Sequence, residues 1–333
     1  MARSCIDADE TVLFFPTVGW REPSGWKLRV HGWIYEPVEY SRIRRAALWL
    51  TRRALRRRIG EAFNDALSRQ RLAAFFADNE RGERLRILCA GREFRLGRSR
   101  ADGHFEGLIE LTAAEADRFA ETRDGARWIP FRAVDRPGDT RPFGGQVMLL
   151  DDTGVSIISD IDDTIKITGV LERRAMLRTT FCEAFASIPG MPELYRRLQA
   201  RHHATFHYVS ASPWQLYPFL TEGLAAAGFP AGTFHLRRLR FKGRLLLGAL
   251  ASASRIKRRH IHDLLVRFPN RRFVLVGDSG ERDGVLYAAL ARHFPRQIEA
   301  IYIRDAGGRS RDWPGIFRGI SAWRVFNSPA DIH

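Results

Sequence analysis

An apolar stretch that runs straight into a group of carboxylates is the feature that most constrains this chain. Residues 155–158 have the sequence VSII, and Asp160, Asp162 and Asp163 follow within the next five positions. Like charges so close together are costly, but ligands bind at the carboxyl ends of strands in open α/β sheets, which favours a functional site. A calcium loop does not fit, because residues 164–165, Thr-Ile, stand where it needs an oxygen ligand and a glycine. A solvated acidic turn is the structural alternative.

Two further apolar stretches also end in polar side chains. FVLVG continues into Asp278 and Asp283, and TFHYVS ends at Ser210. Lys257 lies on a helical run 21 residues before Asp278, and it is one of only four lysines in the chain. Because the carboxyl ends of parallel strands meet at one edge of a sheet, we expect these side chains to lie near the first group of carboxylates. For Lys257, a solvated position on its helix is the alternative.

The rhythm of strands and helices predicts two domains. After Asp151, short apolar strands alternate with helical runs, which is typical of a parallel βαβ sheet. Residues 151–333 are therefore the predicted α/β domain. Short strands separated by turns predict a smaller β-rich, sandwich-like domain over residues 1–150, interrupted by one long basic helix near residues 40–67.

The four polar segments, in this order, resemble the four motifs of the haloacid dehalogenase superfamily of phosphotransferases. The sequences SDIDDTIKITGV, YVSASPWQLYPFL and RFPNRRFVLVGDSGERD more closely resemble the catalytic domain of the actin-patch-type phosphatidate phosphatases, a family with many bacterial members. The resemblance covers about residues 155–305 and implies a Rossmann-like domain. Only 45 residues separate Thr164 from Ser210 and 46 separate Ser210 from Lys257, which predicts a minimal cap and an open site.

The resemblance also implies catalytic roles. Asp160 would be the nucleophile that forms an aspartyl-phosphate, and Asp162 would protonate the leaving alkoxide and later activate water. Ser210 would donate a hydrogen bond to a phosphoryl oxygen, and Lys257 would keep Asp160 ionised and balance charge in the transition state. Thr164 would support the loop after the nucleophile.

Several carboxylates and a phosphate dianion in one site require a cation. Mg²⁺ fits this requirement, because it is a hard ion that takes carboxylates, a carbonyl, waters and substrate phosphate as ligands. By resemblance to the superfamily, the ligands would be the carboxylates of Asp160 and Asp278 and the backbone oxygen of Asp162. Asp283 would orient this ligand set from just outside it.

The chain is strongly basic, with 54 Lys and Arg residues against 38 Asp and Glu residues and a net charge of +16. This balance favours an anionic partner, although a skew of genomic base composition toward Arg also produces it. The predicted helix carries a basic arc that includes Trp49, which suits an anionic membrane surface. A helix docked on its own domain with a solvated basic side fits equally well. A second basic cluster begins at Leu236. The arc consists of Arg42, Arg45, Arg52, Arg53, Arg56 and Arg57.

The sequence therefore predicts a Mg²⁺-dependent phosphomonoesterase whose expected substrate is phosphatidate, with diacylglycerol and phosphate as products. A phosphatase for phosphoproteins or nucleic-acid ends is the alternative in the same class, and a non-catalytic module for anionic membranes or nucleic acid is the alternative from another class. No apolar run reaches the roughly 20 residues of a membrane span, and no signal segment is evident. The three cysteines lack disulfide or metal spacing, so we expect a cytoplasmic protein, peripheral on the membrane.

Overall fold

The computed structural model describes residues 6–134, 140–170, 172–239, 253–280, 282–307 and 312–332. These residues divide into two compact units. The described residues of Met1–Ala54, Leu72–Asp151 and Arg238–Lys242 form the first unit, and those of Leu55–Arg71, Asp152–Arg237 and Gly243–His333 form the second. The units depart from a single division at residue 150 in two respects, because Leu55–Arg71 clusters with the second unit and the described residues of Arg238–Lys242 cluster with the first. Residues 240–244 of the second basic cluster lie outside the described part.

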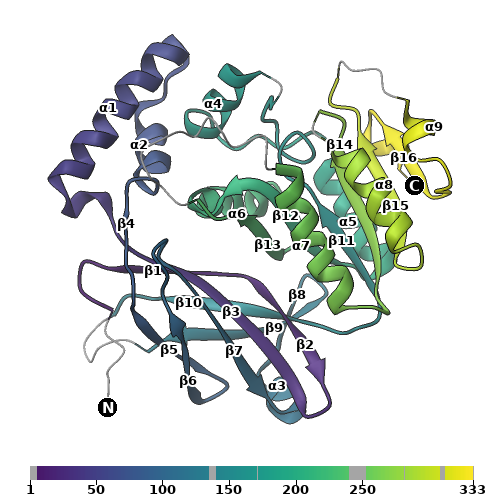
Figure 1. The fold of residues 1–333 in the computed structure, drawn as a ribbon, viewed down its shortest axis with the longest axis horizontal. Helices are drawn as coiled ribbons and strands as arrows, with labels where there is room; N and C mark the ends of the chain where they lie inside the picture. Colours follow the sequence, from purple (N-terminus) through teal and green to yellow (C-terminus); the bar gives the residue numbers. More distant parts are fainter. Residues whose placement is uncertain are drawn as a thin grey trace. The chain divides into compact units, whose positions relative to one another are not determined.

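The second unit is built on one six-stranded sheet in which every pair of neighbouring strands is parallel (Figure 1). The strand order is β13-β12-β11-β14-β15-β16, which is the order 3-2-1-4-5-6 of Rossmann-like sheets. The predicted parallel α/β sheet is therefore confirmed. The strands are β11 (Val155–Ser159), β12 (Thr205–Pro213), β13 (Gly232–Arg237), β14 (Arg272–Asp278), β15 (Ile298–Arg304) and β16 (Trp323–Phe326).

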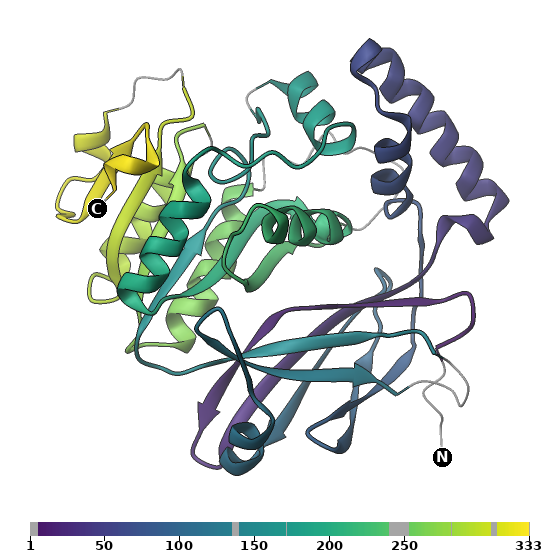
Figure 2. The same cartoon turned by 180° about the vertical axis from the view of Figure 1, so that it is seen from behind.

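Helices cover both faces of this sheet, which explains why β11 and β14 are buried along nearly their whole length. Figures 1 and 2 show α7 and α8 on one face and α5 on the other. One short helix, α4, precedes α5 in the segment between β11 and β12. The helices are α4 (Arg173–Phe181), α5 (Met191–His202), α6 (Tyr217–Ala226), α7 (Ala253–Arg267), α8 (Asp283–His293) and α9 (Trp313–Ile316).

Hydrogen bonds connect the strands of the first unit into one ten-stranded sheet, so the expected sandwich is not confirmed. Its long strand β3 pairs with β1 and β2 along one edge and with β7 and β4 along the other. The strands are β1 (Thr11–Phe15), β2 (Thr17–Glu22), β3 (Gly25–Glu36), β4 (Asp78–Asn79), β5 (Arg84–Cys89), β6 (Arg92–Arg98), β7 (His104–Leu111), β8 (Glu121–Arg123), β9 (Ala126–Ala133) and β10 (Gly144–Leu150).

This sheet curls around its own core. Strand β6 lies so close to β7 that a Cβ atom at Gly97 would come within 2.6 Å of the carbonyl oxygen of Glu106. Apolar side chains from β1, β3, β5 and β9, such as Phe14, Trp26 and Ile129, fill the inside. A curled sheet and a sandwich have the same alternation of apolar and polar residues, so the strand pattern could not tell them apart.

The predicted single helix near residues 40–67 is wrong in its extent. The structure has a short 3-10 turn (Val38–Tyr40), α1 (Arg42–Ile59), a second 3-10 turn (Gly60–Ala62) and α2 (Asp65–Ala73). The long helix ends at Gly60 because that residue has a φ of 72°, which glycine adopts without strain. Helix α3 (Ala113–Phe119) is the remaining helix of the described N-terminal region. None of the described helices combines the length and the apolar character needed to cross a bilayer.

Candidate active site

The strand order places the first two carboxylates at a crevice in the sheet. Asp160 follows β11 directly, and its backbone N–H donates to the carbonyl oxygen of Val276 on β14 at 2.9 Å. Asp278 ends β14. The order of the strands reverses between β11 and β14, and ligands of such sheets bind beyond the carboxyl ends of the strands at that point.

Three carboxylates and one ammonium group are buried together there. Asp160, Asp278, Asp283 and Lys257 are each at most 2% exposed. Lys257, from α7, places its Nζ 2.6 Å from Asp160 Oδ1 and donates to both carboxylate oxygens of Asp283 at 3.0 and 3.1 Å. One carboxylate oxygen from each of the three aspartates lies within 4.8 Å of the others. One positive charge among three carboxylates leaves the cluster short of positive charge, which favours a cation.

Neighbouring groups fix the orientation of this cluster. Thr164 Oγ1 donates to Asp160 Oδ2 at 3.0 Å, and the backbone N–H of Gly280 donates to Asp278 Oδ1 at 2.5 Å. A Cβ atom at Gly277 would lie 2.7 Å from Asp283 Oδ2. Position 277 therefore has room only for glycine while Asp283 contacts Lys257.

Asp162 stands beside this cluster in a second polar group. Its carboxylate accepts hydrogen bonds from Ser210 at 3.0 Å, Ser212 at 2.8 Å and Thr168 at 2.9 Å. The Nζ of Lys166 lies 3.7 Å from Asp162 Oδ1 and donates to Thr168 Oγ1 at 2.9 Å. Burial raises the pKa of the Asp162 carboxyl, but the Lys166 ammonium and the three hydroxyl groups outweigh burial, so the pKa lies below its ordinary value.

The third aspartate of the motif, Asp163, holds the loop rather than the cluster. It has a φ of 56°, and its carboxylate accepts from the backbone N–H groups of Thr168, Gly169 and Val170 at 2.7 to 2.8 Å. Its own carbonyl oxygen accepts from Arg304 at 2.6 Å. This aspartate thus closes the turn that carries Thr164 and Lys166 back toward the site.

The structure brings the seven predicted site residues into two adjoining groups. Asp160, Asp278, Asp283, Lys257 and Thr164 form the first group, and Asp162 and Ser210 belong to the second. Sequence reasoning missed three residues around Asp162, namely Ser212, Thr168 and Lys166. Lys166 could have been found, since it is one of four lysines and lies four residues after Asp162.

The sequence predicts an open site, but the side chains of the carboxylate cluster are buried. The four side chains that form the cluster are buried, whereas the side chain of Asp162 is 13% exposed. Within the described part of the chain, Asp162 and the half-buried Ser212 therefore bring this site closest to solvent.

The donor set fits a magnesium ion. All three clustered side chains offer hard carboxylate oxygens, which Mg²⁺ prefers. Two ligands of Mg²⁺ at about 2.1 Å each lie at most about 4.2 Å apart. The spread of up to 4.8 Å between the carboxylate oxygens therefore needs only a small movement to reach that geometry.

The fold and the site define an α/β protein with a carboxylate-rich centre at the switch point of a Rossmann-like sheet. Residues 155–305 match the family model described as the catalytic domain of phosphatidate phosphatase APP1. This match includes every residue of the two polar groups described above. The second unit of the chain is therefore similar to a phosphatase catalytic domain.

Two curated proteins are each similar over about half of the chain. Phosphatidate phosphatase APP1 of Saccharomyces cerevisiae is 40% identical over 164 residues, which is 48% of this chain and 27% of that protein. An uncharacterized protein of Schizosaccharomyces pombe is 37% identical over 169 residues, which is 50% of this chain and 27% of that protein. The matched stretch thus spans about a quarter of each relative.

Among solved structures, a putative beta-phosphoglucomutase from Thermotoga maritima aligns with 53% of this chain and 95% of its own, at 14% identity and a TM-score of 0.31. A TM-score this low does not establish a common fold.

Proposed function

We propose that the chain is a Mg²⁺-dependent phosphomonoesterase that hydrolyses phosphatidate to diacylglycerol and phosphate through an aspartyl-phosphate on Asp160. The observation that carries the proposal is the contact of the buried Asp160 carboxylate with Lys257 and Thr164, beyond the end of β11. A buried carboxylate held by an ammonium group and a hydroxyl group is oriented for attack and lacks a water shell that would have to be removed first.

Mg²⁺ would be held by the carboxylates of Asp160 and Asp278 and the backbone oxygen of Asp162. When bound, it would supply positive charge beside the phosphate and so allow an anionic nucleophile to approach a dianion. Asp283 already takes both of its hydrogen bonds from Lys257, so it would position that lysine rather than bind the metal directly.

Asp160 attacks phosphorus in the first step, and the bond between phosphorus and the glycerol oxygen breaks. Asp162 gives its proton to that oxygen, which releases diacylglycerol. Its low pKa in the free protein opposes this role, but a phosphate dianion nearby raises the pKa again. In the second step Asp162, now a carboxylate, takes a proton from water as the water attacks the aspartyl-phosphate, and phosphate leaves.

The substrate is inferred from the comparisons. The yeast relative carries the name phosphatidate phosphatase, and the matched stretch includes the residues proposed for both steps of the reaction. The net charge of +16 also favours an anionic lipid over a neutral one.

The proposal is tested by phosphate release from phosphatidate in mixed detergent micelles, with Mg²⁺ and with a chelator. Asp160→Asn should remove turnover, because the amide cannot attack phosphorus and is a poorer metal ligand. Asp263→Asn, an exposed aspartate on α7, is the matched control and should keep full activity. Activity of Asp160→Asn above about a hundredth of wild type would contradict the mechanism. Faster phosphate release from phosphopeptides or nucleic-acid ends than from phosphatidate would show that one of these alternatives is the preferred substrate.

Asp162→Asn separates the two steps. It should allow some phosphorylation of Asp160 but block hydrolysis, because the water attack then lacks its base. Rapid-quench measurement should show a burst of diacylglycerol without steady turnover, and the phosphate should stay bound to the protein. Steady turnover at the wild-type rate would mean that another group is the acid and base.

A further inference from the structure

Helix α1 carries two apolar stripes, of which only one is buried. Leu48, Leu55 and Ile59 are at most 8% exposed and form the seam by which the helix packs. Ile43 is 83% exposed and Leu50 is 59% exposed. A surface helix that packs only on its own fold has polar residues on its outer side, so the second stripe is unexplained by packing.

The second stripe is continuous along the helix. Successive residues are about 100° apart, so Ile43, Ala46, Leu50 and Ala54 fall on one side. Ala46 and Ala54 are exposed as well. Trp49, which is 54% exposed, lies about 60° from Ala46 around the helix, within the basic arc. Aromatic side chains are enriched where helices lie at a membrane–water interface.

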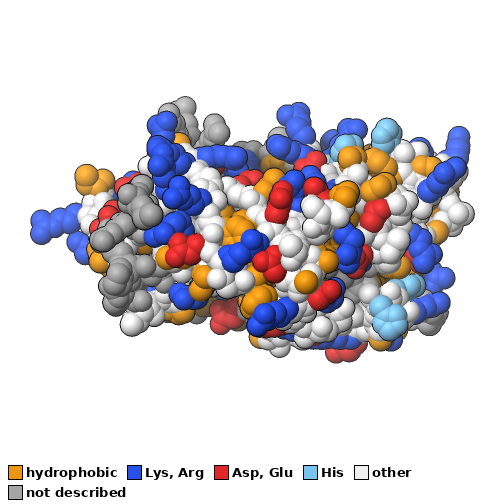
Figure 3. All heavy atoms as spheres, turned by 90° about the horizontal axis from the view of Figure 1, so that it is seen from below, with side chains coloured by type: hydrophobic (Ala, Val, Ile, Leu, Met, Phe, Trp, Pro, Cys, Tyr) orange, Lys and Arg blue, Asp and Glu red, His pale blue; other side chains and the backbone are white. Residues whose placement is uncertain are grey.

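Exposed arginines lie beside this stripe, as Arg53 does, and within it, as Arg57 does, and the basic arc continues away from it around the helix. Helix α1 contains no acidic residue, and among the described residues none of its exposed Arg45, Arg53, Arg56 and Arg57 forms an ion pair. The guanidinium of Arg53 lies 5.4 Å from the ring centre of Trp49. Basic side chains are common elsewhere too, as Figure 3 illustrates for one face of the molecule, so charge alone would not distinguish α1. Helix α1 is distinguished by unpaired charge that lies beside exposed aliphatic side chains.

This combination fits one kind of partner. Two copies of the chain would bring two rows of arginines together, and the repulsion opposes self-association through α1. A nucleic acid would bind the arginines but leave Ile43 and Leu50 in water. A bilayer with anionic lipids accepts both, because apolar side chains enter the acyl region while arginines stay at the level of the phosphates.

We propose that α1 lies flat on anionic membranes, with Ile43 and Leu50 inserted, Trp49 at the interface and the exposed arginines on the headgroups. This inference deepens the proposed function and rests on it, since it gives the surface by which a phosphatase of a bilayer lipid would reach its substrate. It concerns recruitment alone and involves no residue of the two polar groups of the active site.

Sedimentation with vesicles tests the proposal without any phosphatidate. Phosphatidylcholine vesicles with phosphatidylserine should bind the protein, pure phosphatidylcholine vesicles should not, and high salt should reverse the binding. Ile43→Ser with Leu50→Ser should weaken binding at least tenfold. Leu108→Ser with Val266→Ser, which removes two aliphatic side chains that are 55% and 57% exposed, is the control and should bind like wild type.

Charge is tested separately. Replacing Arg45, Arg53, Arg56 and Arg57 by Gln should weaken binding to the anionic vesicles at least tenfold. The same change at the exposed Arg81, Arg84, Arg95 and Arg98 lowers the net charge equally and should have a much smaller effect. Equal effects of the two quadruple variants, or wild-type binding by the Ile43 and Leu50 variant, would overturn the proposal. If the quadruple variant of α1 loses binding to a DNA duplex but binds vesicles like wild type, α1 binds nucleic acid, and this result would also overturn the proposal.

Turnover of a soluble aryl phosphate separates the two proposals. Every α1 variant should keep this turnover, because Asp160 and its neighbours are unchanged. If wild type lacks it while α1 still binds vesicles, the proposed phosphatase function fails and the membrane surface stands. If turnover is normal and vesicles are not bound, only the membrane surface fails.

Discussion

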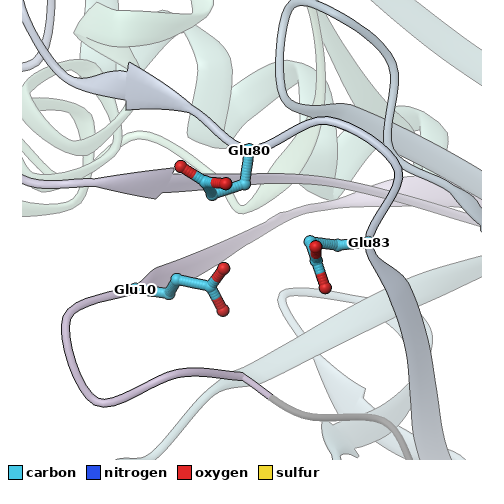
Figure 4. Close-up of side chains that lie close together, drawn as sticks. All are labelled: Glu10, Glu80 and Glu83. Atoms are coloured by element: carbon cyan, nitrogen blue, oxygen red, sulfur yellow. The ribbon is translucent and has the colours of Figure 1, made fainter.

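The molecule contains two groups of three carboxylates that differ in almost everything except their spacing. Asp160, Asp278 and Asp283 lie in the second unit, and Glu10, Glu80 and Glu83 lie in the first. In each group one carboxylate oxygen of every member lies within 4.8 Å of the others. Figure 4 shows that the glutamates come from two segments of the chain, Glu10 from the residue before β1 and Glu80 and Glu83 from the stretch between β4 and β5.

The two groups differ in whether a positively charged side chain, a counter-charge, lies among the carboxylates. Lys257 lies inside the aspartate group and contacts two of its members. Among the described residues, none of the three glutamates forms an ion pair. Burial, together with Glu83 and other nearby carboxylates, raises the pKa of Glu10 to about 7, even though the backbone N–H of Asp7 donates to it. The glutamate group therefore takes up a proton more readily than isolated glutamates do, whereas the aspartate group has the charge of Lys257 beside it.

Proximity of carboxylates is thus a poor guide to a functional centre by itself. The aspartate group has a buried ammonium group, a hydroxyl and a backbone N–H directed at it, and these fix its geometry. The glutamate group is partly open to water, and it has a raised pKa at Glu10 instead of a counter-charge. The following predictions test whether the counter-charge is what separates the two groups.

The largest effect is expected from removing the buried ammonium. Lys257→Met should lower the free energy of unfolding by about 3–5 kcal/mol, because it leaves carboxylates buried without a partner. Urea denaturation measures this loss. Lys27→Met removes a surface lysine that pairs with Glu22 and Glu110 and should cost less than about 1 kcal/mol. A loss below about 1 kcal/mol at Lys257 would mean that its charge is not needed to hold the aspartates.

A smaller effect is expected from Mg²⁺ itself. At about ten times its Kd, Mg²⁺ should stabilise the protein by about 1.4 kcal/mol and raise the Tm by a few degrees. Asp278→Asn should abolish this increase, because it removes a proposed ligand, and differential scanning fluorimetry can follow it. Glu80→Gln should keep the increase. If Glu80→Gln removes it and Asp278→Asn does not, the metal binds the glutamates.

The smallest effect concerns the pH dependence of stability. The pKa of Glu10 is about 7 in the folded protein and ordinarily 4.5, so the folded state binds its proton more tightly. The free energy of unfolding should therefore fall as the pH rises from about 4.5 to 7, and Glu10→Gln should remove the part of this decrease that comes from Glu10. The exposed Glu121→Gln is the control and should leave the pH profile as in wild type. An unchanged profile for Glu10→Gln would show that the glutamates do not share a proton.

The sequence predicted the structure best where a strand ends in polar residues of the candidate site. The strands that end near Asp160, Ser210 and Asp278 were all predicted, because an apolar run followed abruptly by polar residues is typical of a buried strand that ends at a sheet edge. Parallel strands then place those ends at one edge, so the aspartate group followed from the pattern. The glutamate group could not be found in this way, since Glu10 meets Glu80 and Glu83 only where β1 and β4 pair with opposite edges of β3, and the sequence does not reveal that pairing.

The environment of Asp162 was predicted only in part. Ser210 was identified because an apolar strand leads to it, but Ser212 lies where the pairing of β12 becomes irregular and Thr168 lies in a loop. The turn that returns Thr168 to the site depends on a positive φ at Asp163, and aspartate in a run of acidic residues gives no hint of that conformation. Loop geometry of this kind is decided by hydrogen bonds that the sequence does not reveal.

The geometry of the aspartate group depends on the absence of a side chain at Gly277. A single methyl group there would meet Asp283 Oδ2 at 2.7 Å and a ring carbon of Tyr287 at 2.8 Å. Tyr287 is fully buried, so Asp283 would have to move and release Lys257 from one side. The exchange of one hydrogen atom for a methyl group at position 277 would therefore disturb the proposed nucleophile through Lys257, without any contact with Asp160 itself.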